Sequence, residues 1–359
     1  MAVPRPKRQR LARRMGVTMG QRMPECRITR RQFLQGAAAA AIVAAASRAR
    51  SDEATSGPQK TVLSFYCDDT SPYGYPPDTF ERFLDFVSAQ GIAGESTVLL
   101  GPGWQDYPLS RPRTALERAY VAQLQRAFEC GIDSHMEIMT HGALFDFEAG
   151  TPREGAIHEG LWLWEPAVSV ETYQDYFAHV IAEGERIGVR FTGLTWPGCG
   201  CEACTRRYRE LRSQGVSGIN PNVWRALLNL AKEGKFRGRT VPVFPNGEVP
   251  EARARLLAGE GRYAVYDLSP TAGDWLGSYT NSADRVSADY YITEDGDSGR
   301  LVEAVRAGAR YCIFYAHWQG LNPASGVGWQ AFQTVVGRVR KHLADRIVWM
   351  RPSEYTDTL

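Results

Sequence analysis

Residues Thr61–Thr70, with the sequence Thr-Val-Leu-Ser-Phe-Tyr-Cys-Asp-Asp-Thr, contain an apolar run that ends abruptly in two adjacent carboxylates. The part from Thr61 to Tyr66 predicts a buried strand, so Asp68 and Asp69 lie where that strand gives way to its loop. Two neighbouring carboxylates in a partly dry cleft raise each other's pKa unless a cation or hydrogen bonds intervene. The pair therefore indicates a metal site or divided acid and base roles, with a solvated Asp-Asp-Thr turn as the alternative.

Apolar strand-like runs alternate with amphipathic helical segments through the rest of the chain. The predicted strands are Thr61–Tyr66, Thr97–Leu100, Ser134–Met139, Arg190–Leu194, Thr240–Phe244, Tyr263–Tyr266, Ala288–Ile292 and Tyr311–Tyr315. The predicted helices are Asp78–Gln90, Thr114–Cys130, Val170–Ile187, Asn222–Gly234, Pro250–Leu257, Arg300–Ala307 and Trp329–Leu343. This order predicts an α/β fold over residues 61–359, a single (β/α) barrel with seven or eight parallel strands, TIM-like or distorted. A doubly wound sheet is disfavoured because no Gly-x-Gly-x-x-Gly turn follows the first strand.

The first fifty residues have the features of an export signal. Thr29–Leu34 (Thr-Arg-Arg-Gln-Phe-Leu) precedes the small, weakly apolar run Gly36–Ala46 and then Ser47–Ala49, a pattern that resembles a twin-arginine signal. The run is too short and too mildly apolar for a bilayer, which needs about 20 residues. We therefore expect a signal region at 1–50, a linker at 51–60, no stable membrane span, and delivery to the periplasm or medium by the twin-arginine export machinery.

Composition narrows the class of protein further. The net charge is only +2, and the basic residues are concentrated in the predicted signal region, so a nucleic-acid partner is not expected. Cys199, Cys201 and Cys204 form a close cluster whose role we expect to be structural. Disulfides suit an oxidising compartment, and zinc bound before export is the alternative.

Polar side chains suited to catalysis follow most of the predicted strands. They are Asp68 and Asp69, His141, Asn246, Asp267, Glu294 and Asp295, and His317. Because the carboxyl ends of parallel strands meet at one rim of a barrel, we expect these side chains to share that rim. Two of the six histidines of the chain fall at strand ends in the company of a carboxylate pair, which favours a functional site over chance placement.

The order of these motifs resembles the polysaccharide deacetylase (NodB-homology) superfamily of metal-dependent carbohydrate esterases, within the glycoside hydrolase and deacetylase β/α barrels. The similarity lies in Asp68-Asp69, in Glu137–His141, in an aromatic-Pro-Gly loop, and in the last strand running into Phe314–Gln319 and the tail to Tyr355. The resemblance implies a divalent metal, zinc above all, and a carbohydrate substrate. It makes Asp68 the general base, Asp69 and His141 metal ligands, and His317 the catalytic acid.

Two positions depart from the pattern of that family. Where a second histidine ligand is usual, this chain has Phe145, with Asp146 beside it as a substitute ligand. The arginine that orients the base in the Arg-Pro-x-Gly loop is replaced in Trp196-Pro197-Gly198. A divergent member with an altered substrate, or a relative without catalytic activity, would account for such changes.

Aromatic side chains near the predicted rim suit stacking on sugar rings, although tryptophan is also a common core residue. The predicted substrate-binding residues are Trp104, Trp162, Trp164, Trp196, Trp318, Asp267 and Glu294. The segment from Trp162 to Pro166 has poor helical periodicity and is predicted to form a binding lip.

Three classes of function fit these residues. The leading prediction is an exported, metal-dependent carbohydrate hydrolase that removes acyl groups from a sugar. The second is a glycoside hydrolase that uses two carboxylates from Asp68, Asp267, Glu294 and Asp295. The third is a sugar-binding protein without catalytic activity that uses the same cleft.

Overall fold

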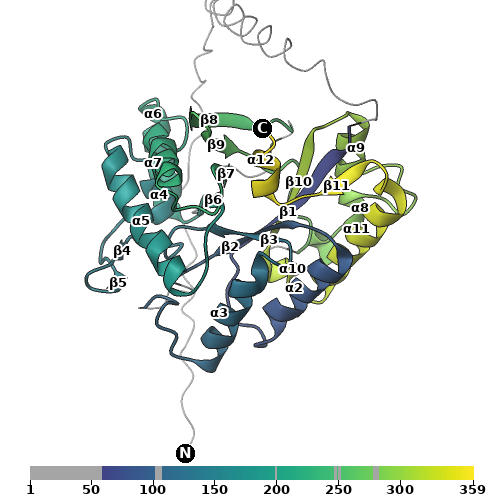
Figure 1. Cartoon of the computed structure of the whole chain (residues 1–359), viewed down its shortest axis with the longest axis horizontal. Coiled ribbons are helices and arrows are strands. Elements are labelled where there is room, and N and C mark those ends of the chain that lie inside the picture. The colour runs from purple at the N-terminus through teal and green to yellow at the C-terminus, as the bar shows by residue number, and fades with distance from the viewer. Residues whose placement is uncertain (1–58, 102–106, 199, 246–248, 250–251, 278–282) are drawn as a thin grey trace, which may run out of the picture. The chain divides into compact units, whose positions relative to one another are not determined.

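The computed structural model describes residues 59–101, 107–198, 200–245, 249, 252–277 and 283–359. These residues belong to one compact unit, Pro58–Leu359. The predicted signal region and nearly all of the predicted linker lie outside the described residues, as do Trp104, Cys199 and Asn246. The α/β class is confirmed, because helices and strands alternate along this unit (Figure 1).

A curled, mostly parallel sheet forms the centre of the unit. In sheet order its strands are β10 (Tyr311–His317), β1 (Thr61–Asp68), β2 (Gly94–Val98), β3 (Ile132–Met136), β6 (Gly193–Thr195), β7 (Thr240–Phe244), β9 (Tyr263–Asp267) and β8 (Arg255–Glu260), with β11 (Ile347–Trp349) paired to β1. Every pairing in this sheet is parallel except that of β8 with β9. A separate small hairpin joins β4 (Phe145–Asp146) to β5 (Thr151–Pro152).

Helices lie around the sheet, with α5 and α7 on one side and α8, α9 and α11 on the other in Figure 1. The helices are α2 (Thr79–Gln90), α3 (Ala115–Ala127), α4 (Glu159–Trp162), α5 (Val170–Arg186), α6 (Glu202–Ser213), α7 (Pro221–Lys232), α8 (Ala288–Tyr291), α9 (Arg300–Arg306), α10 (Trp318–Leu321), α11 (Val327–Leu343) and α12 (Pro352–Thr356), with a 3-10 turn at Ala283–Arg285. Local chemistry sets several of their starts. Thr114, for example, forms a capping box with Glu117 at the beginning of α3.

The two faces of β1 serve different cores because successive side chains point in opposite directions. Phe65 points outward and packs against Phe83, Phe314 and Phe332 in the large core under the helices. Tyr66 points into the curl of the sheet, into a smaller inner cluster. Asp68 is the last residue of β1 and so lies at the carboxyl end of the sheet, where sites are built in folds of alternating parallel strands and helices.

The sheet does not close into a ring through the described strands, since its hydrogen-bonded path ends at β8 and β10. The backbone after β9 does reach β10, where Thr271 N–H donates to the Ile313 carbonyl over 2.8 Å. Only an isolated parallel bridge, Ala272 with Phe314, forms there. The predicted parallel sheet is therefore confirmed, and a closed barrel is not formed by these strands.

Two element predictions are wrong. The expected strand at Ala288–Ile292 contains helix α8, because the Ser287 side chain caps it and the Tyr291 hydroxyl bonds the backbone of Gly273 instead of extending a strand. The expected helix at Pro250–Leu257 contains the start of strand β8, which pairs antiparallel with β9 around a turn at Gly261 in the left-handed region (φ 60°). Pairing with a neighbouring strand overrides the helical preference of a short segment.

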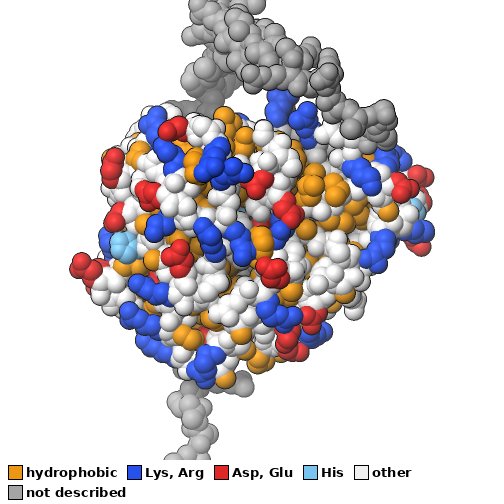
Figure 2. Space-filling view, viewed as in Figure 1, with side chains coloured by type: hydrophobic (Ala, Val, Ile, Leu, Met, Phe, Trp, Pro, Cys, Tyr) orange, Lys and Arg blue, Asp and Glu red, His pale blue; other side chains and the backbone are white. Residues whose placement is uncertain are grey.

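The surface in Figure 2 carries acidic and basic side chains interspersed with one another. Among the described helices, none has the length and apolar character needed to cross a membrane.

The packing of Phe65 against β2 can be tested at Gly94. A Cβ added there would lie 2.6 Å from the Phe65 ring. We expect Gly94→Ala to lower the free energy of unfolding by about 1–3 kcal/mol through overpacking. In exposed Gly337 of α11 a Cβ meets nothing within 4 Å, so Gly337→Ala is expected to stabilise by up to about 1 kcal/mol. Urea denaturation measures both, and equal values for the two variants would contradict this packing.

Candidate metal centre and active site

The site begins where β1 and β10 end side by side. Their parallel register places Tyr66 opposite Tyr315 and Asp68 opposite His317. In each strand the tyrosine hydroxyl reaches the titratable group two residues on, because residues i and i+2 share a face. The Tyr66 hydroxyl donates to Asp68 Oδ2 over 2.9 Å, and the Tyr315 hydroxyl lies 2.7 Å from His317 Nε2.

His317 is held from its other side by Asp274. Asp274 Oδ2 lies 2.7 Å from His317 Nδ1 and also accepts the backbone N–H of His317 over 3.1 Å. Burial disfavours the imidazolium, but the bond to Asp274 and the charge of Asp68 outweigh it and raise the pKa of His317. A histidine held in this way carries a proton at a higher pH than usual, which suits a general acid.

Beside this pair, Asp69, Glu137 and His141 bring ligand atoms within 4.8 Å of one another. His141 Nδ1 lies 3.6 Å from Asp69 Oδ1 and makes a short contact with Glu137 Oε1. Asp69 and Glu137 are buried, whereas His141 is partly open to solvent. Burial works against the charged imidazole, but Glu137 and then Asp69 raise the pKa of His141 to about 10.

Asp68, Asp69 and Glu137 together carry more negative charge than a buried site tolerates without a compensating cation. Burial first, and then the charges of Glu137 and Asp69, raise the pKa of Asp68 well above its usual range. The pKa of Glu137 is likewise raised, chiefly by burial. Two carboxylates and an imidazole are donors that zinc and similar divalent cations accept. Since a divalent cation would offset the clustered carboxylates, these residues fit a metal.

Strained backbone marks the same place. Asp69, Ile138 and His141 are the described non-glycine residues with positive φ, at 60°, 58° and 53°. A β-branched residue such as Ile138 is rarely found there, and each such residue costs about 1–3 kcal/mol. This strained backbone turns the chain after β3 so that Glu137 and His141 face Asp69. Glu137 and His141 are four residues apart in the sequence, and their side chains are in contact.

The buried side chain of Glu159 holds this strained turn. Its carboxylate accepts the backbone N–H groups of Met139, Thr140 and His141 over 3.3, 2.8 and 3.0 Å, and the Tyr176 hydroxyl over 2.7 Å. Burial raises the pKa of Glu159 to about 7, against the lowering effect of these hydrogen bonds. Glu159 begins α4, so a short helix far along the chain orients the His141 loop.

Phe145 and Asp146, where the resemblance led us to expect a further metal ligand, form strand β4 after this loop. Phe145 is buried, and its N–H donates to the Tyr176 hydroxyl over 2.7 Å. Asp146 accepts the N–H groups of Glu148 and Ala149 in the turn between β4 and β5 and does not join the ligand group described above. Glu137 occupies the third place in that group.

In the loop after β6, the indole N–H of Trp196 donates to the Gly160 carbonyl over 3.0 Å, which ties this loop to α4. His158, just before α4, packs its ring 5.7 Å from that of His141. Burial, and then the charge of His141, lower the pKa of His158 to about 4.

The predicted aromatic residues fall into two groups. Trp162 and Trp318 are core residues, the first packed on Tyr173 and the second 1% exposed against Phe83. Trp164 and Trp196 lie together, with ring centroids 6.2 Å apart, where the loops after β6 and α4 meet.

The other predicted carboxylates do not belong to the ligand group described above. Asp267 ends β9. Its carboxylate pairs with Arg255 over 2.9 Å and accepts the backbone N–H of Ser269 over 2.8 Å. Glu294 and Asp295 are exposed in a turn, and the Glu294 carbonyl accepts from His342 in the last turn of α11. Helix α11 starts after β10, near the rim, and runs back for 17 residues. Its last turn, and the Glu294 turn that it contacts, therefore lie at the opposite end of the strands from the rim.

The described cysteines of the cluster open helix α6. Cys201 is its N-cap residue, and its sulfur accepts the backbone N–H of Cys204 over 3.3 Å. Cys204 is buried against Trp164 and Tyr208 in a satellite core. This places Cys204 beside the Trp164 and Trp196 contact, as a support for the loop after β6.

Glu137, Asp274 and Glu159 are among the residues of the site that were not predicted from the sequence. Glu137 had a local signal, its spacing of four from His141 directly after a strand. Asp274 and Glu159 had none, because each acts on a residue 43 or 18 positions away through the tertiary fold.

Comparison with known proteins gives several matches among solved structures. The solved structure of T48 deacetylase with substrate aligns with 84% of this chain and 93% of its own, with a TM-score of 0.37 and 11% sequence identity. No protein-family model and no curated protein matches the sequence.

The role of Glu159 has a pH-dependent signature. Its pKa of about 7 in the fold exceeds the 4.5 of an unperturbed glutamate, so the unfolded chain loses this proton first. Its contribution to stability is therefore present at low pH and declines as the pH rises from about 4.5 to about 7. We expect Glu159→Gln to remove that slope and to lower the free energy of unfolding by roughly 1–3 kcal/mol, because the amide keeps only one acceptor oxygen and turns an NH2 group toward donors that the other oxygen accepted.

Urea denaturation at several pH values measures both effects. The exposed Glu129 provides the matched control, since Glu129→Gln alters no described hydrogen bond of this loop. An unchanged slope in Glu159→Gln would show that the carboxylate does not titrate as stated.

Proposed function

We propose that this protein is a metal-dependent hydrolase that removes acetyl groups from a carbohydrate. The observation that carries the proposal is the placement of Asp69, Glu137 and His141 as one ligand group beside the facing pair Asp68 and His317. A ligand group next to one proton acceptor and one proton donor is what metal-assisted amide or ester hydrolysis requires.

When bound, a divalent cation at this group polarises the scissile carbonyl and favours deprotonation of water. Asp68 is placed to accept the proton of the attacking water, and a cation that offset Glu137 and Asp69 would favour its ionised form. His317 donates a proton to the leaving nitrogen or oxygen. Asp274 keeps the ring of His317 in place through Nδ1 and favours its protonated form.

Zinc is the cation we propose, because His and carboxylate ligands are among those it accepts. Glu137 takes the role for which the sequence suggested Asp146. In our proposal the change from a second imidazole to a carboxylate keeps three protein ligands while making the donor set richer in oxygen.

Isosteric substitutions test the ligand group. We expect Asp69→Asn and Glu137→Gln each to lower bound metal at least about tenfold and to abolish acetate release from acetylated oligosaccharides, because each removes a charged ligand. Asp146→Asn serves as the matched control and is expected to retain both metal and activity. Metal is measured by mass spectrometry of the purified protein and acetate by an enzymatic assay.

The outcomes separate the candidate functions. Full metal content in both Asp69→Asn and Glu137→Gln contradicts the proposal. Hydrolysis of glycosidic bonds that survives a chelator points to a glycoside hydrolase instead. Metal and glycan binding without release of acetate under any metal supplied points to a sugar-binding protein.

We also propose that the protein is exported through the twin-arginine pathway. The support is the sequence around Arg30 and Arg31 and the mild apolar run after it. Replacing both arginines by lysine is expected to retain the protein in the cytoplasm, as measured by cell fractionation. Unchanged export of that variant would refute this route.

A further inference from the structure

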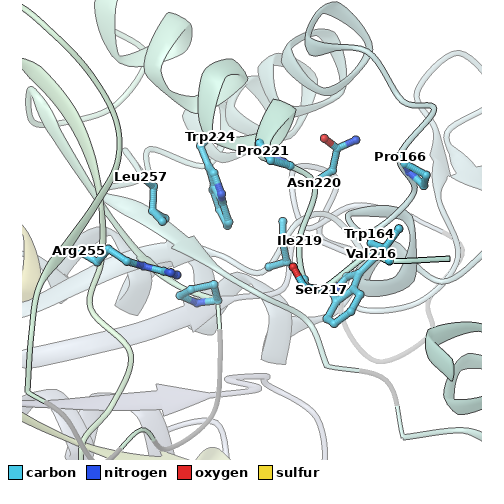
Figure 3. A pocket seen from close by; sticks show the side chains of 13 residues that line it. Trp164, Pro166, Val216, Ser217, Ile219, Asn220, Pro221, Trp224, Arg255 and Leu257 are labelled. Carbon is cyan, nitrogen blue, oxygen red and sulfur yellow. The ribbon is translucent and has the colours of Figure 1, made fainter. Parts of the chain in front are cut away.

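The proposed hydrolysis requires a group that gives a proton to the leaving atom. The cavity in Figure 3 supplies none. It has a volume of about 480 Å³, and its lining includes Trp164, Trp224 and Arg255. Among the described residues of that lining Arg255 alone is ionisable, and a guanidinium does not release its proton near neutral pH. The ends of β1 and β10, by contrast, bring together groups that can exchange protons.

Both ring nitrogens of His317 are engaged within the protein. Nδ1 lies 2.7 Å from Asp274 Oδ2, and Nε2 lies 2.7 Å from the Tyr315 hydroxyl. An imidazolium carries one proton on each nitrogen. The protonated ring therefore donates to Asp274 on one side and to Tyr315 on the other. A leaving atom that took the Nε2 proton directly would first have to displace the Tyr315 hydroxyl.

The Tyr315 hydroxyl is better placed than the imidazole to reach a substrate. His317 is 6% exposed, whereas Tyr315 is half-buried. A hydroxyl that accepts the Nε2 proton directs its own O–H away from the imidazole. Stacking on Tyr66, with ring centroids 4.8 Å apart, fixes the Tyr315 ring, and the Tyr66 hydroxyl donates to Asp68. The stacked pair thus links the proposed acid to the proposed base.

We propose that Tyr315 is a catalytic residue that relays the proton of His317 to the leaving atom, an inference that rests on the proposed function. As the scissile bond breaks, its electron pair goes to the leaving nitrogen or oxygen, which takes the proton of the Tyr315 hydroxyl. The Tyr315 oxygen takes the Nε2 proton in the same step, so that tyrosine stays neutral and His317 becomes neutral. Solvent then returns a proton to His317 and accepts the one held by Asp68.

The relay matters most for a poor leaving group. The amine released from an acetamido sugar requires a proton, whereas 4-nitrophenolate leaves 4-nitrophenyl acetate as a stable anion. Tyr315→Phe keeps the aromatic ring and removes only the hydroxyl. We expect this variant to release acetate from chitin hexasaccharide at least about 100-fold more slowly. We expect its metal content to be unchanged and its hydrolysis of 4-nitrophenyl acetate to stay within about threefold of the unmodified chain.

Two variants serve as controls. Tyr311 lies on the same face of β10, and its hydroxyl donates to the Ser269 carbonyl over 3.4 Å, away from His317. Tyr311→Phe is expected to keep both activities. Asp69→Asn gives the background of ester hydrolysis that does not depend on the metal centre. Ester hydrolysis above that background shows that Tyr315→Phe is folded around an intact site.

The outcomes separate the relay from the proposed function. Equal acetate release from the hexasaccharide by Tyr315→Phe and the unmodified chain rejects the relay alone. An equal loss on both substrates also rejects it, because the hydroxyl then acts on something other than the leaving group. An acetyl group found on Tyr315 by mass spectrometry after acid quenching shows a nucleophile and overturns the relay. Absence of acetate release by the unmodified chain rejects the deacetylase and the relay together.

Discussion

The parallel register between β1 and β10 is the constraint on which the site depends. These strands are far apart in the sequence, and their pairing places Asp68 directly opposite His317, with Tyr66 opposite Tyr315 one layer below. Shifting one strand by a single residue would turn its titratable group to the other face of the sheet, under the helices. The apolar residues that alternate with them, such as Phe65 and Phe314, make that shift costly because they would leave the large core.

A second constraint is local strain held by distant contacts. The turn that brings Glu137 and His141 together needs positive φ at Ile138 and His141, which the chain would not adopt alone. Glu159 stabilises the turn through three backbone N–H groups, and Tyr176 holds Glu159. The cost of burying that carboxylate appears in its raised pKa. The strained backbone therefore lies in the loop that carries two of the three candidate metal ligands.

Much of the fold was predicted from apolar residues that recur with the period of a helix or a strand. Strands such as Thr240–Phe244 and long amphipathic helices such as α5 were predicted to within a few residues, because burial on one face leaves a regular trace in the sequence. Short segments did not follow. Residues 288–292 and 255–260 have no period long enough to separate helix from strand, and their partners Gly273 and β9 decided between them.

The sequence by itself determined the α/β class, the strand that ends in Asp68 and Asp69, and the placement of His141 and His317 after later strands. These features are local, since an apolar run and the residue that follows it can be read without knowing the neighbours. The tertiary structure decided which side chains meet. Glu137 rather than Asp146 completes the ligand group, Asp274 holds His317, and Glu159 orients the loop. The physical reason is that such contacts depend on register, on strained turns and on loops that cross between strands, none of which leaves a periodic pattern in the chain.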